Sequence, residues 1–192
     1  LFSTQNMVLI AIFTALIVVC SWIRVPVQPV PFTLQTFAVF VTAGLLGSKR
    51  GTISVIVYIL LGIIGVPVFA GQVKSGPSVI AGPTGGYIVG FIFTAIVTGL
   101  IVEKAANKLE GVAKIAVTAL AMLVGDVICF AIGTIWFMIL MKNGLVATLG
   151  LCVFPYIIPD IIKIIVAVII VDRMKKYVRY FDEDARVPYL YN

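Results

Sequence analysis

Long apolar runs alternate with short polar segments along this chain, and the pattern predicts helices that cross a membrane. Few charges interrupt the runs, and most approach the roughly 20 residues that a helix needs to span a bilayer. Glycine, proline and clustered lysine residues between the runs mark the expected helix ends. We therefore predict six membrane-spanning helices, over residues 7–23, 34–47, 51–65, 84–103, 114–141 and 155–172.

The composition supports the same class of protein. Hydrophobic residues make up 61% of the 192 residues and charged residues only 11%, and the mean hydropathy is +1.18. A soluble domain contains roughly 45–50% apolar residues, and so few charges would not cover its surface. The sequence predicts an all-α integral membrane protein with a single transmembrane domain over residues 1–192.

The net charge of +6 is explained by membrane topology, so nucleic-acid binding is not needed to account for it. With six helices, only Arg24, Lys74 and Lys142 fall on one side of the membrane. The positive-inside rule assigns the opposite, basic side to the cytoplasm, which places both termini there and predicts a location in the cell membrane. The basic residues on that side are Lys49, Arg50, Lys104, Lys108, Lys114, Arg173, Lys175, Lys176, Arg179 and Arg186.

Two charged residues within the last apolar run are the strongest candidates for a functional site. Asp160 and Lys163 follow Pro159 and lie three residues apart, so they share one helix face. A charge inside a membrane helix costs at least ~2.5 kcal/mol on insertion scales, and its default interpretation is functional. We place both residues at the helix start, where Asp160 suits the helix dipole but Lys163 opposes it. Lys163 therefore needs anions nearby, which favours a ligand site over a purely structural ion pair.

The predicted topology also gathers polar groups at the external face. The second, fourth and sixth helices begin there, and their N-termini provide a setting for an anion. Near the second helix, Thr33 is either an N-cap or a ligand contact. Gln35 needs hydrogen-bond partners in an apolar helix, and either a ligand or another helix would supply them.

Three further positions have both a structural and a functional interpretation. In the segment 82–87, Thr84 would cap the fourth helix and the glycines would allow close packing. Alternatively, Gly85 exposes its backbone N–H to a ligand and Tyr87 forms a wall of the site. Trp136 either stacks on a ligand or anchors the helix at the membrane interface. Asp126, in the middle of the fifth helix, has no evident partner, and we assign it no ligand.

Several kinds of chemistry are excluded or weakly supported. The chain has no histidine, and its three isolated cysteines show no metal-site spacing, so we expect neither catalysis nor a metal. No phosphate-binding loop motif occurs. Ala11 and Ala15 form a small-x-x-x-small pair that allows another helix to approach closely. That helix belongs either to this chain or to a partner subunit.

Four motifs in order along the chain carry a family resemblance. Residues 31–35 (PFTLQ), residues 82–87 (GPTGGY), Gly133-x-x-Trp136 and Pro159-Asp160-x-x-Lys163 together resemble the BioY family, the biotin-binding S components of energy-coupling factor (ECF) transporters. The resemblance covers nearly the whole chain and implies a six-helix S-component bundle. The implied external biotin pocket comprises Thr33, Gln35, Gly85, Tyr87, Trp136, Asp160 and Lys163.

The resemblance also implies partners. The Ala11/Ala15 face would dock on a transmembrane T component that carries two cytoplasmic ATPases, and biotin would be the transported ligand, with no resident cofactor. We expect Asp160 to accept a hydrogen bond from the biotin urea, and Lys163 to contact a carbonyl or carboxylate. Residues 71–78 match no motif of the family, so we assign no ligand contacts to the loop that would cover the pocket.

Two other classes of function are compatible with the residues alone. A self-sufficient secondary transporter or channel for an organic anion would use Lys163 for the substrate and Asp126 for proton coupling. A membrane scaffold would use the small-residue face and need no ligand.

Overall fold

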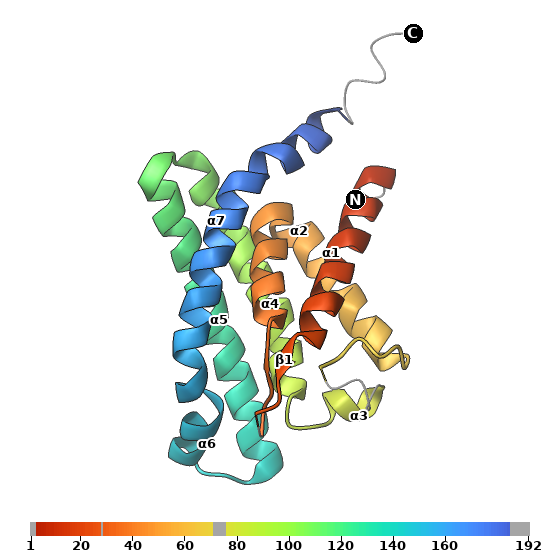
Figure 1. Ribbon diagram of the computed structural model, residues 1–192, viewed down its shortest axis with the longest axis vertical. Helices are drawn as coiled ribbons and strands as arrows, with labels where there is room; N and C mark the ends of the chain where they lie inside the picture. The colour runs from red at the N-terminus through yellow and green to blue at the C-terminus, as the bar shows by residue number, and fades with distance from the viewer. Residues whose placement is uncertain (1–2, 28, 71–75, 185–192) are drawn as a thin grey trace.

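Long apolar helices form most of the structure, a computed structural model that describes residues 3–27, 29–70 and 76–184. Within these residues, five helices are long and apolar enough to cross a membrane. Helix α1 begins and α7 ends at the same end of the bundle, here called the terminal end (Figure 1). The elements in chain order are α1 (Thr4–Trp22), β1 (Arg24–Val25), β2 (Phe32–Thr33), α2 (Gln35–Ile63), α3 (Pro77–Ile80), α4 (Gly85–Lys104), the 3-10 helix η1 (Ala106–Lys108), α5 (Gly111–Met141), α6 (Leu145–Cys152) and α7 (Phe154–Asp184).

Helix α2 folds back on itself at Gly47. This residue has φ 77° and ψ −175°, a non-helical conformation inside the 29-residue run, and the positive φ favours glycine. A Cβ atom at Gly51 would lie 3.1 Å from the Cα atom of Ala43, so the two segments touch beside the bend. Figure 1 shows the first segment reaching the terminal end and the second returning from it. The two helices expected over 34–47 and 51–65 are therefore joined by one bend, without a separate turn.

Helices α4 and α5 pack closely because small residues and threonines line their contact. The Thr94 hydroxyl donates to the Gly125 carbonyl at 2.9 Å, and the Thr98 hydroxyl donates to the Ala121 carbonyl at 3.2 Å. A Cβ atom at Gly90 would lie 3.2 Å from the Cα atom of Cys129. Small residues and interhelical hydrogen bonds of this kind hold membrane helices together without a hydrophobic driving force.

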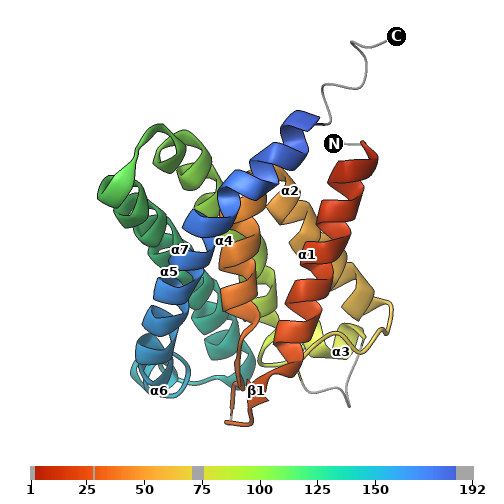
Figure 2. The same cartoon turned by 45° about the horizontal axis from the view of Figure 1, so that its top comes forward.

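The end of the bundle opposite the terminal end, here called the loop end, carries β1, β2, α3 and α6 (Figures 1 and 2). Strands β1 and β2 pair antiparallel, with Arg24 opposite Thr33. The β2 segment is tied to α7, because the Tyr156 hydroxyl donates to the Val30 carbonyl. The rings of Phe32 and Tyr156 also stack with centroids 6.3 Å apart. The connection between β1 and β2 is thereby held across the loop end.

Two differences from the expected helix limits affect the site. Helix α7 begins at Phe154 and continues to Asp184, beyond the expected limit at 172, because helical hydrogen bonding does not stop where hydropathy falls. The short helices α3 and α6 were not expected from the sequence. Each is shorter than a membrane span, and α6 is as apolar as the preceding helix α5.

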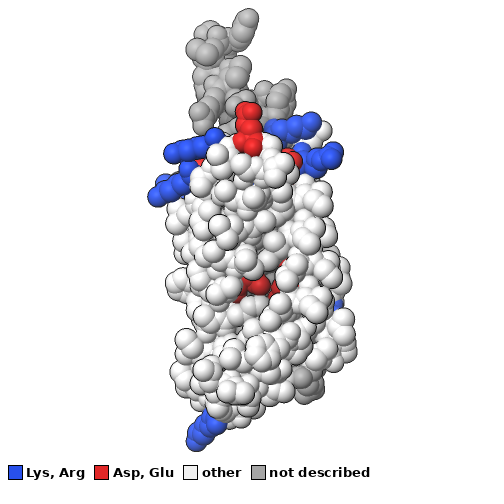
Figure 3. Space-filling model, turned by 90° about the vertical axis from the view of Figure 1, so that its left-hand side faces the viewer, with Lys and Arg blue, Asp and Glu red and all other residues white. Residues whose placement is uncertain are grey.

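Most charged side chains lie near the ends of the bundle. On the face shown in Figure 3, basic and acidic side chains lie together at the terminal end, a basic side chain lies at the loop end, and further acidic atoms are visible in a recess between the two ends. At the terminal end Lys114 pairs with Asp172 at 2.7 Å. Lys175 donates to the Gly44 carbonyl at 2.8 Å. Lys74 and Arg186, which belong to the predicted charge distribution, lie outside the described residues.

Candidate ligand-binding site

A cavity lies between the helices and the segments of the loop end. Its unfilled volume, which includes the open solvent at its mouth, is about 670 Å³. Segments that are distant in sequence contribute to its wall, including residues before α2 and the first turns of α7. Its charged lining residues within the described chain are Asp126, Asp160 and Lys163.

Asp160 and Lys163 form an ion pair at the cavity wall. Lys163 Nζ lies 2.7 Å from Asp160 Oδ1, and the two side chains are only 7% and 5% exposed. Their position in the helix differs from the prediction. Because α7 begins at Phe154, these residues lie in its second and third turns, and Lys163 does not oppose the dipole in the first turn. Pro159 lies inside the helix and does not begin it.

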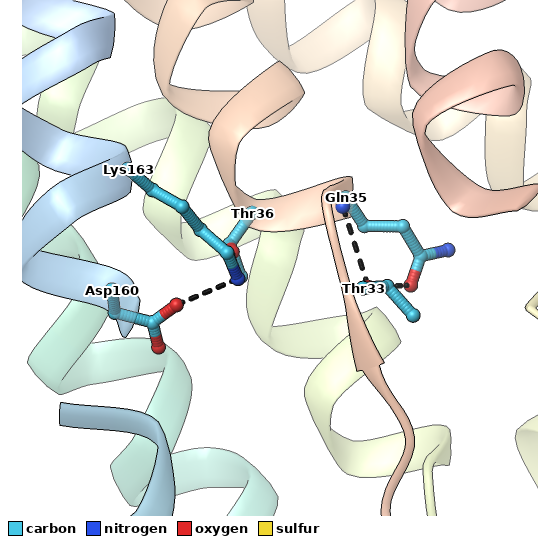
Figure 4. Close-up of polar contacts among 5 residues, drawn as sticks. All are labelled: Thr33, Gln35, Thr36, Asp160 and Lys163. Carbon is cyan, nitrogen blue, oxygen red and sulfur yellow. Dashed lines mark hydrogen bonds and ion pairs between the residues drawn. The ribbon is translucent and has the colours of Figure 1, made fainter. Parts of the chain in front are cut away.

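The Lys163 ammonium has further partners. It donates to the Thr36 hydroxyl at 2.9 Å, and Nζ lies 4.1 Å from the centroid of the Phe32 ring. Figure 4 shows Lys163 reaching from α7 toward the start of α2, with Asp160 beside it. An ammonium has three N–H donors, and the Asp160 and Thr36 bonds use two of them. The third N–H is left for the Phe32 ring or for a bound molecule.

Thr33 and Gln35 form a second polar group on the same wall. The Thr33 hydroxyl donates to Gln35 Oε1 at 3.1 Å and accepts from the Gln35 backbone N–H at 3.3 Å (Figure 4). Gln35 Nε2 donates to the Tyr58 hydroxyl in the returning segment of α2. The N-cap of α2 is Leu34, so the prediction that Thr33 is the N-cap is wrong, although the Thr33 hydroxyl accepts from the first backbone N–H of α2. Gln35 has intramolecular partners and also lines the cavity, and a ligand contact of Thr33 or Gln35 stays a prediction.

Tyr87 lines the cavity from the first turn of α4. Its ring packs directly over Gly133 of α5, where any Cβ atom would overlap it. Thr84 does not cap α4 with its side chain, contrary to the structural alternative. Thr84 lies at the cavity instead, with its hydroxyl not engaged as a cap.

Gly85 and Trp136 are the two predicted site residues that are absent from the cavity lining. A Cβ atom at Gly85 would overlap the Ile80 carbonyl, so close chain packing explains that glycine. Trp136 is 38% exposed, and its Nε1 donates to the Gly82 carbonyl at 3.0 Å. Its side chain also covers Gly86. A ligand contact of Trp136 or Gly85 therefore stays a prediction.

Sequence reasoning missed several residues of the wall. Thr36 and Tyr156 gave no distinct signal, because one hydroxyl and one aromatic ring are common in membrane helices. Asp126 was conspicuous as a charged residue in an apolar helix, but the sequence did not show which way its side chain points. Asp126, Cys129 and Phe130 all line the cavity, at the i, i+3, i+4 spacing of one helix face. Cys152 of α6 also lines it, and burial raises the pKa of its thiol, so it contributes no charge at neutral pH.

Ala11 and Ala15 lie on the exposed face of α1. Large apolar neighbours on that face are also exposed, with Val8 at 51%, Ile12 at 56% and Val19 at 50%. Within the described chain, the small-residue pair thus faces outward and does not mediate internal packing. Figures 1 and 2 place α1 at the edge of the bundle opposite α5.

The fold and the cavity define a class, that of helical membrane proteins with a small-molecule site buried in the bundle. Comparisons with known proteins identify the family within this class. The BioY family matches residues 1–180. A protein of Thermotoga maritima named "Biotin transporter BioY" is 42% identical over 90% of this chain and 96% of its own length. A "Probable biotin transporter BioY" of Pyrococcus horikoshii is 38% identical over 87% and 94%.

A solved structure is similar over the same range. The crystal structure of the S-component for biotin from an ECF-type ABC transporter superposes with a TM-score of 0.83 and 30% sequence identity. The superposition covers 90% of this chain and 91% of that one. This chain belongs to the BioY family.

Proposed function

We propose that this protein is the biotin-binding S component of an ECF transporter. It captures biotin at the external face of the cell membrane and delivers it inward with partner subunits. The observation that carries the proposal is the Asp160–Lys163 pair, which is nearly fully buried in an apolar bundle and lines an open-mouthed cavity. A buried ion pair often adds little net stability to a fold, whereas both charges can form hydrogen bonds with a polar ligand.

Biotin matches the chemistry of this cavity. Its cyclic urea offers two N–H donors and one carbonyl acceptor, and its sulfur ring and aliphatic chain are apolar. Phe69, Ile88 and Phe91 supply apolar wall, while Asp160 and Lys163 supply an acceptor and a donor. We expect Asp160 to accept a urea N–H and Lys163 to donate to an oxygen of the ligand. Thr33, Gln35 and Tyr87 complete the proposed contacts.

The proposed topology has six membrane crossings and cytoplasmic termini. The bend at Gly47 divides α2 into two segments that run in opposite directions, so α2 accounts for two crossings. The basic terminal end would then face the cytoplasm by the positive-inside rule. The loop end, together with the mouth of the cavity, would face outward.

Equilibrium binding of biotin to the purified protein tests this function. A thermal-shift screen with biotin, thiamine, riboflavin and simple anions would accompany it. Biotin at about 100 times its Kd should stabilise the protein by about 2.7 kcal/mol, and the other compounds should not. Stabilisation by another vitamin without biotin binding would refute the proposal. Uptake by the protein alone in liposomes, driven by an ion gradient, would instead indicate a secondary transporter.

We further propose that the outward face of α1 docks on the T component, which carries two cytoplasmic ATPases. The observations that support this are the exposed Ala11 and Ala15 among larger apolar side chains. Replacing Ala15 by Trp should fill the space that a neighbouring helix would enter. We expect the Ala15→Trp variant to bind biotin normally, but to lose co-purification with the T component and ATPases and to lose uptake.

The matched control is Ala116→Trp. Ala116 is an exposed alanine on α5, at the opposite edge of the bundle, so the same increase in size is introduced away from α1. Normal assembly of the Ala15→Trp variant, or equal loss in both variants, would contradict docking through α1.

A further inference from the structure

Among the charged residues that line the cavity in the described chain, Asp126 is the one that the proposed contacts do not use. It lies near the middle of the 31-residue helix α5 and is only 6% exposed. Its Oδ1 atom is buried and has no hydrogen-bond partner among the described residues. Such a group in a membrane helix costs free energy and is functional by default. Figure 3 shows acidic atoms in a mid-height recess. Asp126 and Asp160 are the buried carboxylates of the described chain.

The packing of α5 fixes the direction of this side chain. The residue before it, Gly125, lies against Thr94 and Thr98 of α4, and the Thr94 hydroxyl donates to its carbonyl at 2.9 Å. The hydrogen bond from Thr98 to Ala121 lies a little more than one turn away. Helix α5 therefore cannot rotate freely, and Asp126 is held on the cavity side, where Cys129 and Phe130 also lie.

Asp126 shares the lining of one cavity with Asp160 and Lys163. The hydrogen bond of Lys163 to Asp160 and its bond to Thr36 leave Asp126 without a cationic partner in the described chain. The cavity thus holds two carboxylates and one ammonium. Each carboxylate can accept a hydrogen bond, and the ammonium can donate one. These groups complement the two N–H donors and the carbonyl acceptor of a cyclic urea.

We propose that Asp126 is a specificity-determining residue that accepts one urea N–H of the ligand, while Asp160 accepts the other and Lys163 donates to the urea carbonyl. This inference rests on the proposed function and assigns the three charged groups of the cavity to one end of biotin. A cavity that leaves a buried carboxylate unpartnered until the ligand arrives rejects rings that lack the second N–H. The ligand class is therefore a neutral cyclic urea with both nitrogens unsubstituted.

The test uses Asp126→Asn, with Asp126→Ser as a second variant, and two measurements on the purified protein. Loss of a charge-assisted hydrogen bond should weaken biotin binding about tenfold or more. Removal of a buried carboxyl group that has no hydrogen-bond partner for Oδ1 among the described residues should raise the midpoint of thermal unfolding of the ligand-free protein. If Asp126 only supported the fold, its replacement would lower both the affinity for biotin and the midpoint of thermal unfolding.

Biotin methylated on one or the other urea nitrogen isolates the contact. With one isomer, Asp126→Asn should cause no further loss of affinity, because the N–H that it binds is already absent. With the other isomer, the loss should remain about tenfold, and Asp160→Asn should show the reverse pattern. An equal loss for biotin and both isomers would overturn the inference, as would unchanged biotin affinity in both Asp126 variants. Absence of biotin binding by the unmodified protein would refute the proposed function itself.

Discussion

The Asp160→Asn variant should bind biotin roughly ten- to a hundredfold more weakly than the unmodified protein. The substitution keeps the size of the side chain but removes the charge that both Lys163 and a urea N–H would use. Hydrogen bonds to charged groups contribute about 1.5–3 kcal/mol, and each 1.4 kcal/mol corresponds to a factor of ten in Kd. Equilibrium binding of labelled biotin to the purified variant measures the change.

The chain offers a matched control for this substitution. Asp172 belongs to the same helix and pairs with Lys114 at the same 2.7 Å, but it lies at the terminal end, away from the cavity. We expect Asp172→Asn to leave biotin affinity unchanged. Equal affinity in the Asp160→Asn and Asp172→Asn variants would remove Asp160 from the proposed contacts.

The second large effect concerns stability. Lys163→Met should lower the free energy of unfolding by about 3–5 kcal/mol, because it leaves the buried Asp160 carboxylate without its cation. The double variant Asp160→Leu/Lys163→Met should recover most of that loss, since replacing a whole buried pair with apolar side chains is often neutral or stabilising. The double variant should still fail to bind biotin. Unfolding in mixed detergent micelles, combined with the binding assay, separates these outcomes.

The exposed pair again supplies the comparison. The side chains of Lys114 and Asp172 are 26% and 35% exposed, and exposed ion pairs contribute about 0.2–1 kcal/mol. We therefore expect Lys114→Met to lower the free energy of unfolding by no more than about 1 kcal/mol. The double variant Asp160→Leu/Lys163→Met could instead be as unstable as Lys163→Met alone. That result would show that the unpaired Asp160 carboxylate does not cause the fall in the free energy of unfolding.

Hydropathy was sufficient to predict an all-helical membrane protein, because long apolar runs report directly on membrane-sized helices. It did not predict how α2 would turn, since a single residue, Gly47, makes the bend. It also missed α6, whose apolar residues merge with those of the next helix in any sliding average. The end of α7 was misplaced for a related reason, because hydropathy falls at Asp172 while the helix continues.

The candidate site could be predicted where a residue is rare in its surroundings. Asp160, Lys163 and Gln35 stood out as polar groups in apolar helices, and all three line the cavity. The direction of a side chain was harder to predict in α5, which is apolar on most of its surface. Nothing in the sequence distinguished the face that carries Trp136 from the face that carries Asp126. Packing against α4 makes that distinction, and it depends on contacts between residues far apart in the chain.

The way in which α1 is attached bears on how this protein can change over evolution. Thr14, Ser21 and Trp22 donate side-chain hydrogen bonds to the backbone carbonyls of Ser54, Val68 and Pro67. A carbonyl accepts in the same way whichever side chain its residue carries. Substitutions at the three acceptor positions can therefore accumulate without removing these bonds. The outer face of α1 can therefore stay constant while the segments behind it diverge.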